Sequence, residues 1–250
     1  MRSHRCRRRP LVTDTLTIDG RFNGPPASAN GGYTCGLLAQ ALGEEAAEVS
    51  LRSPPPLDTP LALTRHGGRV EARHGSTLVA EGGPAELLLD VPDAVPAAEI
   101  AAAEPAGLAR WTEHHPFPTC VVCGPARDAG DGMRIFPVEL PRRAPLFGAR
   151  WTPEAWLADD RGRVRPECVW AALDCPTSAP VANFGEGPPM VLARLAARLG
   201  CSALAGEEHS IVSWPLEVAG RKRHSGAALF DSGGRMLCAA RALWIELRPG

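Results

Sequence analysis

Two stretches of this chain have the same pattern of expected elements, and this internal repeat most constrains the fold. Residues 48–89 and residues 210–247 each contain an apolar strand that ends in proline, a polar break, and then a strand–turn–strand unit. A helix candidate rich in small residues precedes each stretch, at residues 31–42 and from residue 169 onward. A helix followed by an antiparallel meander, present twice, predicts an α+β fold in which curved sheets surround central helices.

The composition limits the classes of function that the chain can have. With 250 residues, 44% of them hydrophobic, the chain can bury one large core or two modest ones. Its net charge of −1 produces no overall field that would attract nucleic acid or an anionic membrane. No apolar run approaches the ~20 residues of a membrane span. We therefore expect neither a nucleic-acid partner nor a membrane.

The first ten residues, MRSHRCRRRP, are basic, but no apolar stretch follows them as it would in a secretory signal. A frayed tail, an overlong start assignment and an arm that attracts nucleic acid would all explain them; the arm lacks aromatic partners. We expect residues 1–14 to be a disordered basic tail. The eight cysteines lie mostly in apolar segments. Without a signal peptide, we expect reduced thiols and a cytoplasmic location.

The expected elements divide the chain into two units and a linker. In the first unit, residues 15–90, we expect a buried helix at 31–42 and strands at 16–22, 49–52, 61–65, 70–74 and 78–81. Residues 91–116 are rich in Ala, Pro and Glu and predict a linker, with a helix at 97–109. In the second unit, residues 117–250, we expect strands at MRIFPV and LFGARWTP, an amphipathic helix at 190–199, and three final strands with a hairpin at 231–234.

Three motifs resemble known protein families. FNGPPASANGGYTCGLLAQAL resembles the TesB-type double-hotdog acyl-CoA thioesterases, whose first helix also opens with Gly-Gly and contains Ala-Gln-Ala. CVVCGPARDAGDGMRIFP and VWAALDCPTSA resemble the PaaI-like hotdog thioesterases, whose corresponding helix ends on a catalytic carboxylate. The resemblance covers most of both units. It implies a tandem (double) hotdog, with two central helices each wrapped by a curved antiparallel sheet, and an acyl-thioester pocket between the units.

Asp174 is the first candidate for a catalytic group. It lies in an otherwise apolar helical turn just before Pro176, where a carboxylate is costly to bury without a partner. A general base or a nucleophile for thioester hydrolysis would explain this position. The alternative is a carboxylate that accepts hydrogen bonds from local backbone N–H groups in the turn before proline. The resemblance and the apolar surroundings together favour the catalytic role.

The segment Asn30-Gly31-Gly32 opens the first expected helix and is a second candidate. Asn30 could orient the substrate, and the N–H groups of Gly31 and Gly32 could form an oxyanion hole. An Asn N-cap followed by glycines in a tight turn explains the same residues without a site. The matching place in the second half reads Arg165-Pro166-Glu167, without a glycine pair. We therefore expect at most one composite site per chain.

Gln40 and a basic turn are candidates for substrate binding. TesB-type enzymes take a catalytic Gln from a late strand, where this chain has Ala-Arg-Ala at residues 240–242. Gln40 could contact the substrate instead, although a structural hydrogen bond would explain it equally. Arg221, Lys222 and Arg223 could bind the phosphates of coenzyme A. The alternative for these three residues is a solvated turn.

Cys120 and Cys123 follow His114 and His115, and these four residues could supply zinc ligands. A second Cys-x-x-Cys is missing, and the related opening in the hotdog families carries no metal. We therefore expect a loop with incidental thiols, and neither a metal nor another cofactor. A Cys–His nucleophile pair is less well supported, because nothing nearby in the sequence marks an oxyanion hole.

Together these features predict hydrolysis of an acyl-CoA or related acyl thioester, with Asp174 as base or nucleophile. The resemblance also implies that several copies of the chain associate into a homo-oligomer. Non-catalytic binding of an acyl-CoA or acyl-lipid is the main alternative, because the second Gly-Gly and the late-strand Gln are missing. A hydratase or dehydratase ranks third, since such hotdog proteins carry a His near the Asp and none lies near Asp174.

Overall fold

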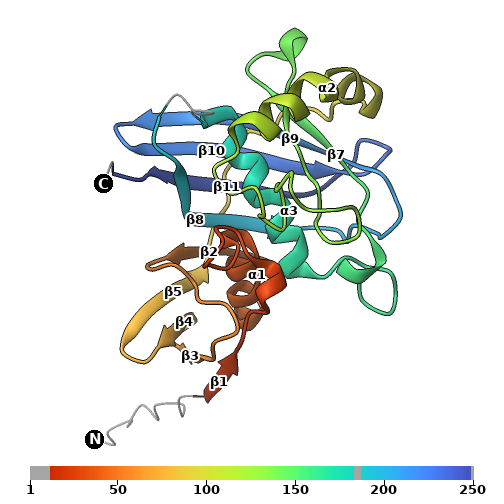
Figure 1. Ribbon diagram of the computed structural model, residues 1–250. Coiled ribbons are helices and arrows are strands. Elements are labelled where there is room, and N and C mark those ends of the chain that lie inside the picture. The colour runs from red at the N-terminus through yellow and green to blue at the C-terminus, as the bar shows by residue number, and fades with distance from the viewer. Residues whose placement is uncertain (1–11, 183–186, 249–250) are drawn as a thin grey trace, which may run out of the picture.

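The computed structural model describes residues 12–182 and 187–248, which form one eleven-stranded antiparallel sheet and three α-helices (Figure 1). The helices are α1 (Gly31–Leu42), α2 (Ala97–His114) and α3 (Pro166–Ser178). The strands are β1 (Val12–Leu16), β2 (Ala46–Leu51), β3 (Leu61–His66), β4 (Arg69–His74), β5 (Thr77–Pro84), β6 (Val138–Glu139), β7 (Phe147–Trp151), β8 (Met190–Leu199), β9 (His209–Ala219), β10 (Lys222–Phe230) and β11 (Met236–Glu246). Within these residues, no helix is both long and apolar enough to cross a bilayer.

The sheet consists of two halves that repeat the same strand order. The full order is β1-β3-β4-β5-β2-β8-β11-β10-β9-β7-β6, and β2 pairs antiparallel with β8 at the centre. Counted outward from that centre, β2, β5, β4, β3 and β1 correspond to β8, β11, β10, β9 and β7. Helix α1 packs on the first half and α3 on the second, and the two helices contact each other. The predicted α+β fold with two wrapped helices is confirmed.

Small residues on α1 let the two central helices approach closely. A Cβ atom on Gly32 would lie 2.4 Å from the Cβ of Asp174, and one on Gly36 would lie 2.6 Å from the Cα of Glu167. Residues four apart share one face of a helix, so these two glycines form a single contact surface against α3. The scarcity of large side chains on α1 therefore serves helix–helix packing as well as burial under the sheet.

Residues 190–199 form strand β8, and the predicted amphipathic helix is wrong. Apart from Val191, the segment consists of Met, Leu, Ala and Arg, which all favour helices. Both edges of β8 are nevertheless paired, one with β2 and the other with β11, so backbone hydrogen bonding to neighbours overrides the local preference. The repeat therefore begins one strand earlier than the sequence indicates, because the counterpart of β2 is β8 and not β9.

Other boundaries differ at the ends of the units. The strand expected at 16–22 is wrong, because β1 ends at Leu16 and Gly20–Phe22 is a 3-10 turn capped by the Asp19 side chain. The start of the expected basic tail, residues 1–11, lies outside the described residues, and β1 begins at Val12. MRIFPV contributes only to the short β6, whereas LFGARWTP contains β7 and the hairpin at 231–234 is confirmed.

The segment between the units contains a long helix that covers part of the sheet. The helix predicted at 97–109 is confirmed and extends to His114. Ile100 of α2 is fully buried in an apolar cluster with Val212, Trp214 and Phe230 of the second half. Helix α2 contacts β6 and β7 at this end of the sheet, and Figure 1 shows it beside β7. This segment therefore contributes to the core of the second half and does more than connect the units.

Candidate active site

A cavity of about 880 Å³ has walls from both halves of the molecule. Its volume falls in the range of small-molecule sites. The first half contributes the N-terminus of α1 and the end of β2, and the second contributes α3, β8 and β11. Apolar side chains make up most of the wall: Leu51, Pro54, Pro55, Trp111, Phe117, Met190, Leu192, Trp244 and Ile245. The cavity can therefore hold an apolar group beside a small number of polar atoms.

Asp174 lies at the wall of this cavity and is 2% exposed. Its Oδ2 accepts a hydrogen bond of 2.8 Å from the backbone N–H of Gly32, at the N-terminus of α1. Among the described residues, its Oδ1 has no hydrogen-bond partner. The bond to Gly32 joins residues 142 positions apart, so the local turn considered as an alternative does not hold this carboxylate.

The buried surroundings of Asp174 stabilise its neutral, protonated form relative to the charged carboxylate. Burial raises the pKa of Asp174 to about 7, and the N–H of Gly32 and the nearby Asn30 amide oppose that rise. The position of Gly32 in the first turn of α1 also places the carboxylate at the positive end of a helix dipole. A carboxyl group with a free oxygen in such an environment can accept and return a proton.

Asn30 and Gly31 line the same cavity, with different partners. Asn30 is the N-cap of α1, since its Oδ1 accepts the N–H of Tyr33 at 2.8 Å. Its Nδ2 lies 3.9 Å from the Sγ of Cys120 and 4.0 Å from the Sγ of Cys175. Within the described chain, the N–H of Gly31 has no hydrogen-bond partner.

The expected pair of oxyanion donors is thus reduced to one. The N–H of Gly32 is engaged by Asp174, so it orients the carboxylate and is not free for a carbonyl oxygen. The N–H of Gly31 is one of the four that a helix leaves without an intrahelical partner. It is therefore the backbone donor that remains for a ligand in the cavity.

The other predicted substrate contacts lie away from this cavity. Gln40 donates to Glu167 through a 2.6 Å bond between Nε2 and Oε2, which is a contact between α1 and α3. Arg221 donates to the backbone oxygen of Glu246, and Arg223 pairs with the carboxylate of that residue. Neither these residues nor Lys222 lines the cavity. A contact between any of them and a substrate stays a prediction.

Sequence reasoning missed several residues of the cavity wall. Trp244 of β11 is fixed there by a 2.9 Å hydrogen bond from its Nε1 to the Oγ1 of Thr177. Cys175 follows Asp174 directly, and its Sγ lies 3.8 Å from that of Cys120. No local pattern in the sequence signals the Trp244–Thr177 contact or the Cys175–Cys120 contact, because each joins segments that are distant along the chain. Hydrogen bonds from the thiols of Cys123 and Cys175 lower the pKa of Cys120.

Solved structures resemble this arrangement, whereas comparison with protein-family models and with curated protein sequences gives no match. The TesB protein of Mycobacterium avium subspecies paratuberculosis superposes with a TM-score of 0.65 at 12% identity, over 94% of this chain and 93% of that one. A protein of Alicyclobacillus acidocaldarius described as having a hot dog fold gives 0.61 at 10% identity, over 95% and 94%. This chain is a double hotdog.

An acyl-CoA thioesterase II, TesB2 of Mycobacterium marinum, also resembles the double hotdog, with a TM-score of 0.60 at 16% identity over 95% of this chain and 94% of that one. At these identities the likeness shows the fold. The double hotdog expected from the sequence motifs is therefore confirmed, and the chemistry of the site has to be argued from its own residues.

The approximate symmetry of the double hotdog places a second, incomplete site opposite the first. Asp174 is the ninth residue of α3, and the ninth residue of α1 is Ala39. Gly31 opens α1, and Pro166, which has no N–H, opens α3. The symmetry-related place therefore lacks both the carboxylate and the free backbone donor, and a single composite site per chain stays a prediction.

Proposed function

We propose that this protein hydrolyses an acyl thioester, such as an acyl-CoA, in the cavity beside Asp174. One observation supports this most directly: a buried carboxylate has one oxygen fixed by Gly32 and the other unpaired within the described chain, at the wall of a largely apolar cavity. The description of the similar Mycobacterium marinum structure as an acyl-CoA thioesterase II agrees with this chemistry. The apolar wall fits the acyl group of such a substrate.

In the proposed mechanism, Asp174 acts as a general base. Its Oδ1 removes a proton from a water molecule, whose oxygen forms a bond to the thioester carbonyl carbon. The negative charge that develops on the carbonyl oxygen is stabilised by the N–H of Gly31 at the start of α1. When the tetrahedral intermediate collapses, the carbon–sulfur bond breaks and the departing thiolate takes the proton from Asp174. The hydrogen bond from Gly32 keeps the carboxylate oriented throughout.

One feature favours the non-catalytic alternative, binding of an acyl-CoA or acyl-lipid without turnover. The late strand that supplies a Gln in TesB-type enzymes has Ala240, Arg241 and Ala242 here. Both alanines are buried, and the Arg241 guanidinium lies 3.8 Å from the carboxylate of Glu48. No amide from this strand is therefore available to position a water molecule. Self-association and a cytoplasmic location belong to the same proposal and stay predictions.

A thiol-release assay over short, long, branched and aromatic acyl-CoAs tests the proposal, with Asp174→Asn beside the wild type. We expect the variant to lose turnover by about 10²–10⁴-fold, the usual contribution of a general base. Its fold should persist, because the amide oxygen of Asn can still accept the N–H of Gly32. Glu167→Gln is the matched control, since Glu167 is a buried carboxylate on the same helix that lies outside the cavity.

Unchanged turnover in Asp174→Asn would overturn the role of Asp174. If the wild type releases no thiol from any of these substrates but binds acyl-CoA in a calorimetric titration, the binding alternative replaces hydrolysis. Circular dichroism and thermal unfolding of each variant show whether a loss of turnover reflects chemistry or folding.

A further inference from the structure

Three buried thiols meet at one side of the cavity, and the proposed hydrolysis uses none of them. Cys120 and Cys123 come from the loop before β6, and Cys175 comes from α3. Their Sγ atoms lie within 4.8 Å of one another, and this is the only cluster of potential metal ligands found among the described residues. Sulfur ligands placed tetrahedrally around zinc at about 2.3 Å would be about 3.8 Å apart. The Sγ atoms of Cys120 and Cys175 are separated by 3.8 Å.

The loop that carries two of these thiols is held in a tight turn. The N–H of Gly124 donates to the backbone oxygen of Cys120 at 2.9 Å, and the N–H of Ala126 donates to that of Pro118 at 3.0 Å. A Cβ atom on Gly124 would lie 2.5 Å from backbone atoms of Cys120 and Pro118, so only glycine fits here. The turn brings both thiols of the Cys-x-x-Cys segment to the same side of the loop.

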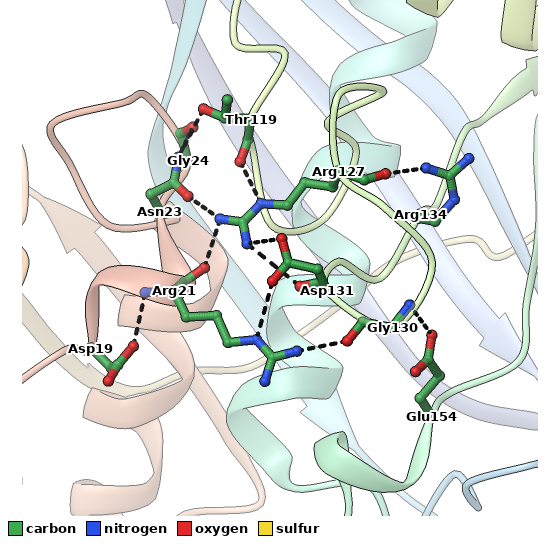
Figure 2. A network of polar contacts seen from close by, with 10 residues as sticks. All are labelled: Asp19, Arg21, Asn23, Gly24, Thr119, Arg127, Gly130, Asp131, Arg134 and Glu154. Carbon is green, nitrogen blue, oxygen red and sulfur yellow. Dashed lines mark hydrogen bonds and ion pairs between the residues drawn. The ribbon is translucent and has the colours of Figure 1, made fainter.

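Arg127 connects this loop to the first unit of the fold by hydrogen bonds, as Figure 2 shows. Its guanidinium donates to the backbone oxygens of Thr119 at 2.8 Å and Arg21 at 2.9 Å, and to the carboxylate of Asp131 at 2.9 Å. The Arg127 side chain is only 12% exposed, so solvent weakens these contacts little. The contact with Arg21 therefore holds the loop against the first unit, and those with Thr119 and Asp131 hold the loop to itself.

Two side chains beside the cluster are placed to donate hydrogen bonds to sulfur. The Nδ2 of Asn30 lies 3.9 and 4.0 Å from the Sγ atoms of Cys120 and Cys175. The Nε2 of His115 lies 3.1 Å from the Sγ of Cys123, and its Nδ1 accepts the backbone N–H of Phe117 at 2.9 Å. In neutral histidine, an accepting Nδ1 leaves the hydrogen on Nε2. His115 is therefore placed as a donor to sulfur, and such donors stabilise metal-bound thiolates.

We propose that Cys120, Cys123 and Cys175 bind one zinc ion as thiolates. Thiolate ligands select soft or borderline cations such as zinc over magnesium or calcium. The ion would neutralise two of the three negative charges of the buried thiolates. The N–H groups of Asn30 and His115 would partly stabilise the negative charge that is left. All three cysteines line the cavity, so the fourth position of the ion is left for a water molecule or a ligand from that side.

This proposal replaces the interpretation of incidental loop thiols. The sequence shows one Cys-x-x-Cys with nearby histidines and no further ligand close by. Folding adds Cys175 from a helix 55 residues away from Cys120. A disulfide between Cys120 and Cys175 is the main competing structure. It would need the sulfur atoms to move to about 2.05 Å and would leave Cys123 unpaired.

The test measures the zinc content of the purified protein and does not depend on thioesterase activity. The full chain is expressed with zinc in the medium, purified under reducing conditions without a metal-affinity column, and analysed by inductively coupled plasma mass spectrometry. We expect about one zinc ion per chain in the wild type. Cys175→Ser should lose most of it, whereas Cys201→Ser, which changes an exposed thiol outside the cluster, should keep all of it.

Cobalt provides a second readout if the Cys175 variant folds poorly. Co²⁺ added to the zinc-free wild type should give the near-ultraviolet absorption of thiolate-to-cobalt charge transfer, which added zinc should abolish. His115→Ala should retain the metal with an affinity lower by about 10–100-fold, as expected for a donor outside the metal shell. Complete loss of metal in that variant would overturn the donor role and make His115 a ligand.

A wild-type protein that contains no zinc and gives no thiolate absorption with Co²⁺ would overturn the proposal. So would equal zinc contents in Cys175→Ser and Cys201→Ser, because the metal would then be bound elsewhere. Peptide mapping by mass spectrometry of protein purified without reductant is the last control, and a disulfide between Cys120 and Cys175 there would also reject the metal site in favour of the competing structure.

Discussion

At the scale of residues, Gly31 and Gly32 are adjacent but have different roles. Gly32 needs to be glycine because α3 passes so close to it, and its N–H is bound to Asp174. A Cβ atom on Gly31 would lie 2.9 Å from the Cδ2 and 3.1 Å from the Cβ of Leu192, and 3.1 Å from the Cδ1 of Leu51, so it would meet side chains and no backbone. The N–H of Gly31 is therefore the property of this residue that the proposed reaction requires.

Replacing Gly31 by Pro tests this role, because proline is favoured at the first position of a helix but has no N–H. Asn30 already has the extended backbone that precedes proline, with φ −60° and ψ 132°. We expect Gly31→Pro to lower kcat by about 10²–10³-fold, the usual loss when one oxyanion donor is removed. Turnover is measured with the best acyl-CoA of the panel.

Gly31→Ala is the matched control, since it adds the same Cβ atom and keeps the N–H. It should retain most of the activity. Equal loss in the alanine and proline variants would show that the residue matters for space alone and would remove the N–H from the mechanism.

At the scale of elements, β8 shows how pairing decides secondary structure. Its residues favour a helix, yet the strand joins the two units because β2 and β11 pair with its two edges. Leu195 lies opposite Val49 of β2 and Ala242 of β11, and all three side chains are buried. The junction between the units is therefore an apolar core and not only a set of backbone hydrogen bonds.

Leu195→Ala should lower the free energy of unfolding by about 2–5 kcal/mol, because a fully buried leucine is replaced by a cavity. Arg198→Ala on the same strand should change it by less than about 0.5 kcal/mol, since that side chain is exposed. Urea unfolding followed by circular dichroism measures both. A small effect of Leu195→Ala would mean that the β2–β8 junction contributes little to stability.

At the scale of the whole molecule, two similar halves contribute to one candidate site. The carboxylate comes from α3, and the free backbone donor comes from the N-terminus of α1. The reciprocal combination would use Ala39 of α1 and Pro166 of α3, which supply neither group. The repeat of the fold therefore does not repeat the groups to which the proposed reaction assigns a role.

We expect acyl-CoA to bind with a stoichiometry of one per chain. Isothermal titration calorimetry of Asp174→Asn measures this without turnover, because the variant lacks the proposed base. Binding of two molecules per chain would contradict the composite site and would indicate that the symmetry-related place is also functional. The titration is repeated with a chain-length series to compare the fit of the acyl group to the cavity.

The sequence by itself determined the α+β class, the presence of a repeat though not its first strand, the first central helix and the last three strands, because periodicity and turn residues are local signals. It also indicated Asp174, since an isolated carboxylate in an apolar segment needs a reason. A resemblance carried by short motifs supplied the double hotdog. These predictions depend on residues that are neighbours in the chain.

Only the tertiary structure decided the partners of those residues. It made β8 a strand, assigned the N–H of Gly32 to Asp174, removed Gln40 from the cavity and brought Cys175 to Cys120 and Cys123. Each of these contacts joins segments that lie far apart in the sequence. Strand pairing, helix contacts and clusters of ligand side chains depend on distances in space. Local patterns along the chain do not specify these distances, because the contacts form only when the two halves fold together.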